Sequence, residues 1–228
     1  MSQSKNHLVV KSNKLIEASY RLDLSEQRII LMAITEARET GNGITSDNFI
    51  EIRAVDFSAL YGLSERTAYD QLRNAGKSLF RRYVVLKSIN EKNGKIEETE
   101  ARWVSAVTYV AGSGLIRLQF SGVIAPYITR LETEFTSYKL KAVSQMTSNY
   151  AVRLYELIIQ WRLLKEREIE ISELKQILFV HAEKAYDRID NFKKKIIDIA
   201  VNQINEYSDI TVSYTQRKSG RTVTHLIF

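Results

Sequence analysis

One segment of the sequence reads Arg188-Ile-Asp-Asn-Phe-Lys-Lys-Lys-Ile-Ile-Asp-Ile-Ala-Val-Asn-Gln-Ile-Asn-Glu206, and its apolar residues recur with the spacing of an amphipathic α-helix. One side of this helix carries Ile189, Phe192, Ile196, Ala200 and Ile204. The opposite side carries Arg188, Asn191, Lys194, Lys195, Asp198, Asn202 and Asn205, with Lys193 on a flank. We therefore expect the apolar side to face a core and the mainly cationic side to face solvent or an anionic partner.

Two β-prone runs, 210–215 and 222–228, follow this helix. The connection between them, Gln216-Arg-Lys-Ser-Gly-Arg221, supplies a Ser-Gly turn and places Arg217, Lys218 and Arg221 at its tip. A helix followed by a strand, a basic turn and a second strand is the outline of a winged helix. A solvated surface also explains a lysine run, but the interleaved asparagines and the second basic element favour contact with nucleic acid.

The first half of the chain follows a similar plan. We expect a helix over 24–39 with Ser25 as its N-cap and Gly41-Asn-Gly43 at its end, and a short strand over 49–52. Helices over 55–60 and 64–82, separated by Tyr61-Gly-Leu-Ser64, form a helix-turn-helix pattern. On the second of these helices the apolar stripe is Ala68, Leu72, Ala75 and Leu79. The other side of that helix carries Arg66, Tyr69, Asp70, Arg73 and Lys77.

The two halves repeat one arrangement of a short helix, a turn, a longer helix with a cationic outer side and a β-hairpin. The segments concerned are 55–120, with strands over 83–89, 102–110 and 115–120, and 172–228, where Ser172 caps a helix over 173–179. A helix over 147–165 links them and packs Tyr150, Leu154, Leu157, Ile158, Trp161 and Leu164 on one face. Residues up to Leu22 are expected to form an arm. The predicted fold is a helix-rich α+β protein of two tandem winged-helix domains, 1–126 and 127–228, divided after the only proline, Pro126.

The composition narrows the class of protein. The chain has 228 residues, of which 44% are hydrophobic, no cysteine and a formal net charge of +6. This length is sufficient for two modest domains, and the basic balance favours an anionic partner. The lack of cysteine excludes disulfides, thiolate nucleophiles and cysteine-ligated zinc. No apolar run approaches the roughly 18 residues of a membrane span, and the amino terminus lacks a signal region, so we expect a cytoplasmic protein without a membrane partner.

The sequence offers little support for an enzyme. Gly76-Lys-Ser78 lies inside an amphipathic helix rather than after a strand, which argues against a phosphate-binding loop. His7, His181 and His225 lie far apart, so neither a metal site nor the paired histidines of a replication nuclease can be identified. The acidic run Glu97-Glu-Thr-Glu100 is interpreted as a polar loop. We therefore expect no catalytic residue, no metal and no cofactor.

Three segments, taken in order, have a counterpart in a known family. They read Leu24-Ser-Glu-Gln-Arg-Ile-Ile30, Tyr150-Ala-Val-Arg-Leu-Tyr-Glu-Leu157 and Phe192-Lys-Lys-Lys-Ile-Ile-Asp-Ile-Ala-Val-Asn-Gln-Ile-Asn-Glu206. With the two-domain plan, they resemble the replication initiator (Rep) proteins of iteron-containing bacterial plasmids. The resemblance covers nearly the whole chain. It implies that monomers bind direct-repeat iterons and open the origin, and that dimers bind an operator and repress the protein's own promoter. The implied partners are double-stranded DNA, a second copy of the chain, and the host initiator, helicase and chaperones.

The resemblance also assigns roles to individual residues. Bases are to be read by the helix of the second domain, with Arg188 and Lys194 as the main candidates, since Arg and Lys can both contact guanine. Asn191 and Asn202 are assigned to adenine or phosphate, beside Lys193 and Lys195. The phosphate backbone is assigned to Arg217, Lys218 and Arg221 of the hairpin and, in the first domain, where we also expect dimerisation, to Arg66, Arg73 and Lys77 with Tyr69 beside them.

Three other functions remain open at this point. A winged-helix transcription regulator uses the same surfaces but does not open the origin. A replication nuclease or nucleotide-driven motor requires the catalytic groups that the sequence lacks. A DNA-packaging protein binds without sequence preference.

Overall fold

The computed structural model describes residues 7–40, 44–110, 112–129 and 134–228. Its α-helices are α1 (Asn13–Glu17), α2 (Leu24–Glu39), α3 (Ala54–Tyr61), α4 (Glu65–Leu79), α5 (Lys141–Ser144), α6 (Asn149–Ile159), α7 (Ile171–Ile177), α8 (Ile189–Phe192) and α9 (Asp198–Tyr207). Short 3-10 turns, η1 (Ala125–Tyr127) and η2 (Lys184–Tyr186), and a π-helical segment, η3 (Lys193–Ile197), complete the helical structure of the described residues. The strands are β1 (Leu8–Ser12), β2 (Ser19–Tyr20), β3 (Ile50–Arg53), β4 (Tyr83–Ile89), β5 (Ile96–Arg102), β6 (Val104–Val110), β7 (Leu115–Phe120), β8 (Phe135–Lys139), β9 (Glu168–Glu170), β10 (Thr215–Ser219) and β11 (Thr222–Ile227).

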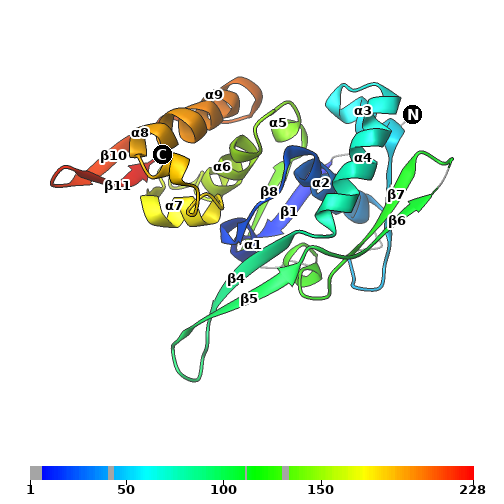
Figure 1. The fold of residues 1–228 in the computed structure, drawn as a ribbon, viewed down its shortest axis with the longest axis horizontal. Helices are drawn as coiled ribbons and strands as arrows, with labels where there is room; N and C mark the ends of the chain where they lie inside the picture. Colours follow the sequence, from blue (N-terminus) through cyan, green and yellow to red (C-terminus); the bar gives the residue numbers. More distant parts are fainter. Residues whose placement is uncertain (1–6, 41–43, 111, 130–133) are drawn as a thin grey trace.

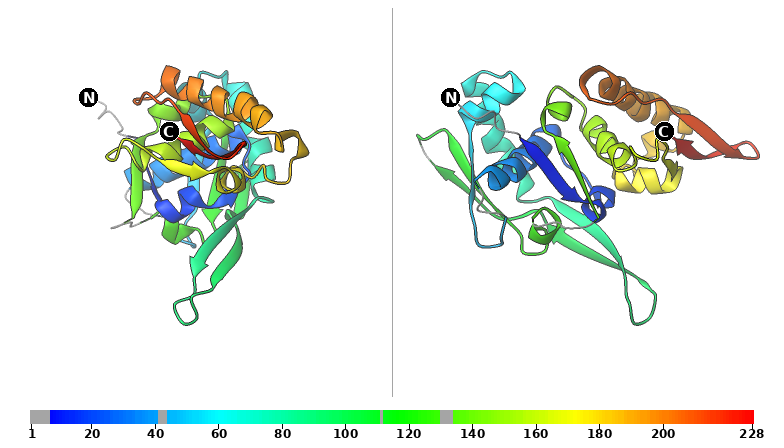
Figure 2. Two further views of the ribbon diagram at one scale, coloured as in Figure 1. Left: turned by 90° about the vertical axis from the view of Figure 1, so that its left-hand side faces the viewer. Right: turned by 180° about the vertical axis from the view of Figure 1, so that it is seen from behind.

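The same unit occurs twice along the chain. In each copy a short strand leads into two helices, and the copy ends in a hairpin whose last strand pairs with the short strand. In the first copy an additional hairpin, β4–β5, lies between the helices and this last hairpin. The sheet orders are β3-β7-β6 in the first copy and β10-β11-β9 in the second. The two hairpins lie at opposite ends of the molecule (Figure 1; Figure 2, right). This arrangement confirms the predicted α+β fold with two winged-helix units.

The first helix-turn-helix follows from local sequence signals. Gly62 ends α3 with a φ of 64°, a left-handed conformation that glycine adopts without a steric penalty. Ser64 then caps α4, because its Oγ accepts a hydrogen bond from the Thr67 backbone N–H at 3.2 Å. The predicted apolar stripe of α4 is buried as expected: Ala68, Leu72, Ala75 and Leu79. The two helices are therefore placed by a glycine, a serine and one apolar stripe.

Several expectations for the first half are wrong in detail. The segment before Leu22 is not an arm, because β1 pairs with β8 and β2 pairs with β4. The acidic run at 97–100 is not a loop, because it lies in β5, which pairs with β4 along its full length. The N-cap of α2 is Asp23 rather than Ser25, and the Glu26 side chain accepts a hydrogen bond from the Asp23 N–H at 2.7 Å. The proposed helix end at 41–43 and position 111 of the β6–β7 turn lie outside the described residues.

The hairpin of the second unit begins later than expected. Residues 211–214 are irregular rather than extended, and the first strand is Thr215–Ser219. The turn is therefore Gly220-Arg221, with Gly220 at a φ of 59°, and Arg217 and Lys218 lie in the strand rather than at the tip. The irregular segment is held against α9 by hydrogen bonds of its own, which replace those of a sheet. The short strand β9 adds a third strand that the sequence analysis did not foresee.

Helix α6 lies at the centre of the molecule and packs against both α1 and α9. It ends at Ile159 rather than continuing to 165, and two members of the expected stripe, Trp161 and Leu164, are exposed. Turns follow over 160–165, and Lys165 adopts a left-handed φ of 59°, a conformation that a helix cannot contain. α7 also begins two residues early, with Glu170 instead of Ser172 as its N-cap. A domain boundary after Pro126 stays a prediction; the next strand, β8, pairs with β1.

A buried charge network joins α6 to the strands beneath it. Lys11 Nζ donates to Glu156 Oε1 at 2.6 Å, and Arg153 Nη1 lies 3.3 Å from Glu156 Oε2. Tyr138 also donates its hydroxyl hydrogen to Glu156, at 2.5 Å, and Arg153 donates to the Tyr20 hydroxyl. All of these side chains are buried. Removing one member of such a network leaves an uncompensated buried charge, so the network favours a single arrangement of α6 against β1 and β8.

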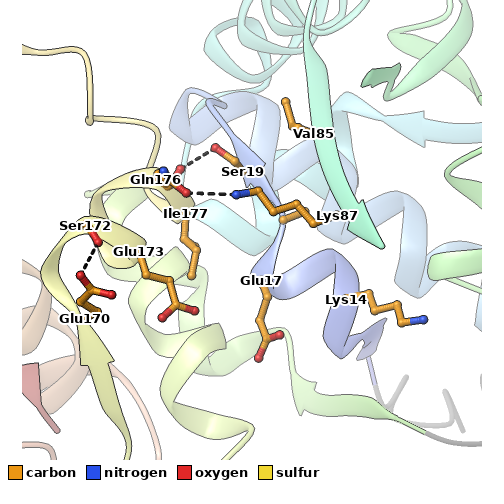
Figure 3. A pocket seen from close by; sticks show the side chains of 11 residues that line it. Lys14, Glu17, Ser19, Val85, Lys87, Glu170, Ser172, Glu173, Gln176 and Ile177 are labelled. Atoms are coloured by element: carbon orange, nitrogen blue, oxygen red, sulfur yellow. Dashed lines mark hydrogen bonds between the residues drawn. The ribbon is translucent and has the colours of Figure 1, made fainter. Parts of the chain in front are cut away.

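A second contact between the halves lies along α7. The Ser19 hydroxyl donates to the Gln176 carbonyl oxygen, and Lys87 Nζ donates to Gln176 Oε1 at 3.1 Å (Figure 3). The two side chains point toward α7 across a cavity of about 460 Å³. Tyr83 and Phe179 pack edge to face nearby, with ring centroids 6.0 Å apart. These contacts and the packing of α6 on α9 fix the two winged-helix units relative to each other.

Candidate nucleic-acid interface

The cationic helix of the second unit is continuous from α8 to α9 but contains one π turn. The Asp198 N–H donates to the Lys193 carbonyl oxygen, five residues back, instead of to the residue four back. The buried residues of this helix are Phe192, Ile196, Ile197, Ala200, Val201 and Ile204. A regular helix aligns residues that are three, four, seven and eight apart. Ile196 and Ala200 lie four and eight residues after Phe192, but Ile197 and Val201 lie five and nine residues after it, one residue more than a regular helix aligns. The wider π turn at 193–197 accommodates this extra residue, so that Phe192 lies on the same buried side of the helix as the residues that follow it.

The residues on the outer side of this helix fall into two groups: free residues, whose side chains have no partner among the described residues, and engaged residues, whose side chains bind another part of the chain. The free residues are exposed and form no hydrogen bond or ion pair with the rest of the described chain: Arg188, Lys194, Lys195 and Asn202. Among the engaged residues, Asn191 donates to the Ala185 carbonyl oxygen at 3.3 Å. Lys193 donates to Gln216 Oε1 at 3.1 Å and lies 5.7 Å from the ring centroid of Tyr214, so it connects the helix to the hairpin.

Two residues that the helical spacing placed outward serve the fold instead. Asn205 clamps the Val212 backbone, because its Oδ1 accepts from the Val212 N–H at 2.6 Å and its Nδ2 donates to the Val212 carbonyl oxygen at 2.9 Å. Asp198 accepts a hydrogen bond from the Tyr214 hydroxyl at 2.6 Å. Burial and this bond raise the pKa of Tyr214. Helical spacing alone could not distinguish Asn205 and Asp198, which stabilise the fold, from the exposed Asn202, since all three lie on the polar side of the helix.

The hairpin β10–β11 carries the three residues that are predicted to contact the DNA backbone, and these residues differ in exposure and in their partners. Lys218 and Arg221 are exposed, and Arg221 is the residue that lies in the turn. Arg217 is held by the sheet, because its Nε lies 3.0 Å from Glu168 Oε1 of β9 and its Nη2 contacts the His225 ring. The structure therefore brings Lys193 and the hairpin together, and it pairs Arg217 with an acid.

On the first unit, α4 presents Arg66, Arg73 and Lys77 as exposed side chains, which agrees with the expected outer side. Tyr69 is half-buried and packs against the core. Burial raises the pKa of Tyr109, a residue of β6, and the positive charge of Arg73 opposes this rise. The DNA-binding role of all these residues stays a prediction.

Sequence reasoning missed one exposed cation of the first sheet. Arg117 lies in β7, and its Nε is 2.8 Å from Glu51 Oε1 of β3. The available signal was the alternation of Leu115-Ile-Arg-Leu-Gln-Phe120, which places Arg117 on the outer face of its strand. The partner Glu51 belongs to a strand far away in sequence, so no spacing rule connects the two residues.

Other kinds of site were also sought in the described part of the chain. Over residues 7–40, 44–110, 112–129 and 134–228, no three His, Asp or Glu side chains gather as metal ligands would. In the same residues, none of the helices has the length and apolar character required to traverse a bilayer. The exposed cations on two helix-turn-helix units are thus the surface that best fits a ligand.

Taken together, the repeated strand, helix pair and hairpin define a protein of the double winged-helix class. Residues 8–159 match the family model described as "Initiator Replication protein, WH1", and residues 170–228 match "Initiator Rep protein, WH2". The chain therefore belongs to the family of initiator replication proteins.

Three known proteins show how this chain relates to the family. The PI protein of Escherichia coli is 26% identical over 257 residues, which cover 100% of this chain and 84% of that protein. An uncharacterized 27.6 kDa protein of Escherichia coli is 22% identical over 229 residues, which cover 96% of this chain and 93% of that protein. The crystal structure of the Pi initiator protein in complex with iteron DNA superimposes with a TM-score of 0.79 at 23% identity, over 99% of this chain and 97% of that one. The two proteins thus share a fold along their whole length.

Proposed function

We propose that this protein binds the direct-repeat iterons of a plasmid origin as double-stranded DNA and initiates replication there. The observation that carries this proposal is the set of free cationic side chains Arg188, Lys194 and Lys195, which stand beside the free Asn202 on the outer side of a helix whose Asn191 and Asp198 are engaged. Membership of the initiator family and the similarity to a protein solved with iteron DNA support it. Base reading by the α8–α9 helix and backbone contacts by the hairpins follow the usual division of labour in such proteins.

The first test is selection of duplexes from a random library at physiological salt. Two recognition helices on one chain should enter successive major grooves, so the retained DNA should contain one asymmetric motif of about two helical turns. A short palindrome would instead mean that one unit reads bases and that the binding species is a dimer. That result would favour a winged-helix transcription regulator.

The roles of individual residues can be separated with the selected motif. Arg188→Ala should cost about 1–3 kcal/mol on the motif and much less on random duplex, because a bidentate contact to guanine is lost. Lys218→Ala should weaken both duplexes to a similar extent and reduce the salt dependence, because it removes a phosphate contact. An equal loss on both duplexes for Arg188→Ala would reassign that residue to the backbone.

We further propose the actions that go beyond DNA binding. Monomers open an adjacent AT-rich segment and recruit the host initiator and helicase in the bacterial cytoplasm, and host chaperones are further partners. Dimers, formed through the first unit, bind an operator and repress the protein's own promoter. Chemical probing for unpaired bases beside the repeats tests origin opening, and a duplex that stays paired would leave only the regulator function.

A further inference from the structure

Both winged-helix units carry a glutamate at the same position of the strand that leads into the first helix. Glu51 lies three residues before α3 begins, and Glu168 lies three residues before α7 begins. The residue that follows each glutamate, Ile52 or Ile169, is buried. Since successive side chains of a strand point to opposite faces, both glutamates lie on the outer face of their sheets.

Each glutamate holds an arginine of the adjoining hairpin. Glu51 Oε1 lies 2.8 Å from Arg117 Nε, and Glu168 Oε1 lies 3.0 Å from Arg217 Nε. The arginine side chains are 45% and 53% exposed and their glutamates 40% and 36% exposed, so water reaches both pairs. Exposed pairs of this kind are held weakly and exchange partners easily. A Glu–Arg ion pair therefore occurs on the outer face of each wing sheet, with the glutamate at the equivalent strand position. The arginines differ in place: Arg117 lies in β7, directly opposite Glu51, whereas Arg217 lies in β10 and reaches Glu168 past β11.

We propose that Glu51 and Glu168 are positioning residues that compete with DNA phosphate for Arg117 and Arg217. The proposal rests on the function proposed above, in which the hairpins contact the DNA backbone. When a hairpin reaches the duplex, the carboxylate and a phosphate compete for the arginine, so the arginine is only partly available to the phosphate. The two glutamates thereby lower the affinity of the protein for every duplex, whatever its sequence, because phosphate contacts supply the sequence-independent part of binding.

A purely structural pair makes a different prediction. If the Glu–Arg contacts only tied the strands together, replacing a glutamate would lower the stability of the fold and leave DNA binding unchanged. Competition with phosphate instead predicts tighter binding in the variant. The two roles therefore differ in the sign of the change in affinity and in its dependence on salt.

The experiment uses the full chain and a random-sequence duplex, with affinity measured over a series of salt concentrations. Glu168→Gln and Glu51→Gln should each tighten binding by about two- to fivefold, the range that exposed ion pairs span. The matched control is Glu166→Gln, which removes the same charge two residues from Glu168; Glu166 is exposed and forms no hydrogen bond or ion pair with the described residues. This control should tighten binding less and should not alter the salt slope, whereas each tested variant should steepen it by up to about 0.9 for one more phosphate contact.

The contribution of the arginine is checked with Arg217→Ala alone and combined with Glu168→Gln. The double variant should bind like Arg217→Ala, because the glutamate acts through the arginine. Equal affinities for Glu168→Gln and Glu166→Gln, or a gain that persists without Arg217, would overturn the proposal. If the unmodified chain bound no duplex even at low salt, the function proposed above would fail and this inference would fail with it.

Discussion

Glu156 shows at the scale of one residue how the interior depends on charge. Burial pushes the pKa of this carboxyl upward, but Lys11 and Arg153, with hydrogen bonds from Lys11 and Tyr138, outweigh burial and hold the pKa below its ordinary value of 4.5. Glu156→Gln leaves two buried cations without their counter-charge and should lower the free energy of unfolding by about 3–5 kcal/mol at neutral pH. Urea denaturation measures this loss, with Glu91→Gln in the exposed β4–β5 turn as the control.

The same network predicts a dependence on pH. Because the folded-state pKa of Glu156 is lowered, the charged carboxyl contributes stability above its unfolded pKa, and that contribution is lost as pH falls through the folded pKa. The difference in unfolding free energy between the unmodified chain and Glu156→Gln should therefore be constant near neutral pH and shrink below about pH 4. A difference that stayed constant down to pH 3 would mean that the carboxyl does not carry this charge.

Asn202 and Asn205 form a matched pair of tests on one helix. Asn205→Ala removes two hydrogen bonds to Val212 and should lower stability by about 1–3 kcal/mol with little direct effect on DNA contacts. Asn202→Ala changes an exposed side chain and should alter stability by less than about 0.5 kcal/mol while weakening binding to the selected motif. Thermal unfolding and DNA titration of both variants check the distinction; a stable Asn205→Ala variant would contradict the clamp.

The sequence could predict the residues that lie on the cationic side of each recognition helix, because spacing determines direction. It could not predict which of them are free. Asp198 is taken up by Tyr214 and Arg217 by Glu168, and both partners lie on other elements. Lys194 and Asn202 remain exposed only because no such partner reaches them. Contacts between segments that are distant in sequence determine which residues are free, and no local sequence pattern predicts such contacts.

At the scale of the element, the π turn at Lys193–Ile197 makes a prediction that can be tested by changing the length of the chain. Deleting Lys194 places the buried residues after Phe192 at the spacing of a regular helix, so the melting temperature should stay the same or rise. DNA affinity should fall only as far as it falls in Lys194→Ala, because Phe192 stays in the core and Arg188 therefore keeps its direction relative to Asn202. Lys194→Ala is the control, since it loses the same charge without a change of length. A deletion that unfolds the protein would show that the helix needs the π turn.

Elements with a clear apolar period were predicted well. The bounds of α2, β4 and β7 match the expected ranges, and α4 differs by one residue at its start and three at its end. The elements that were missed, such as β2 and β9, contain two or three residues and exist only through pairing with β4 and β11. The sequence predicts a loop at 97–100 of β5 because this run is entirely polar, and all four residues are exposed in the strand. A strand without a buried face shows no alternation of apolar and polar residues in its sequence. Such a strand can be identified only from its pairing with another strand.

For the whole molecule, α6 predicts that the two halves unfold together. The chain contains two tryptophans; Trp103 is fully buried in the first half, and Trp161 follows α6 and is 40% exposed. A Trp161→Phe variant reports on Trp103 alone, and Trp103→Phe reports on Trp161 alone. Fluorescence should give the same denaturation midpoint for each variant as circular dichroism gives for that variant, because α6 packs against both α1 and α9. Two separate midpoints within one variant would show that the halves are independent.

The position of α6 between the two winged-helix units also affects how DNA sites can vary. A flexible connection would let each recognition helix find its half of a site separately, but a packed helix keeps the two at one distance and one angle. Inserting a single base pair between the halves of a bound repeat turns one half by about a tenth of a turn around the duplex axis. The protein would have to strain its own core or release one half. Repeats recognised by this chain should therefore vary in base sequence far more readily than in length.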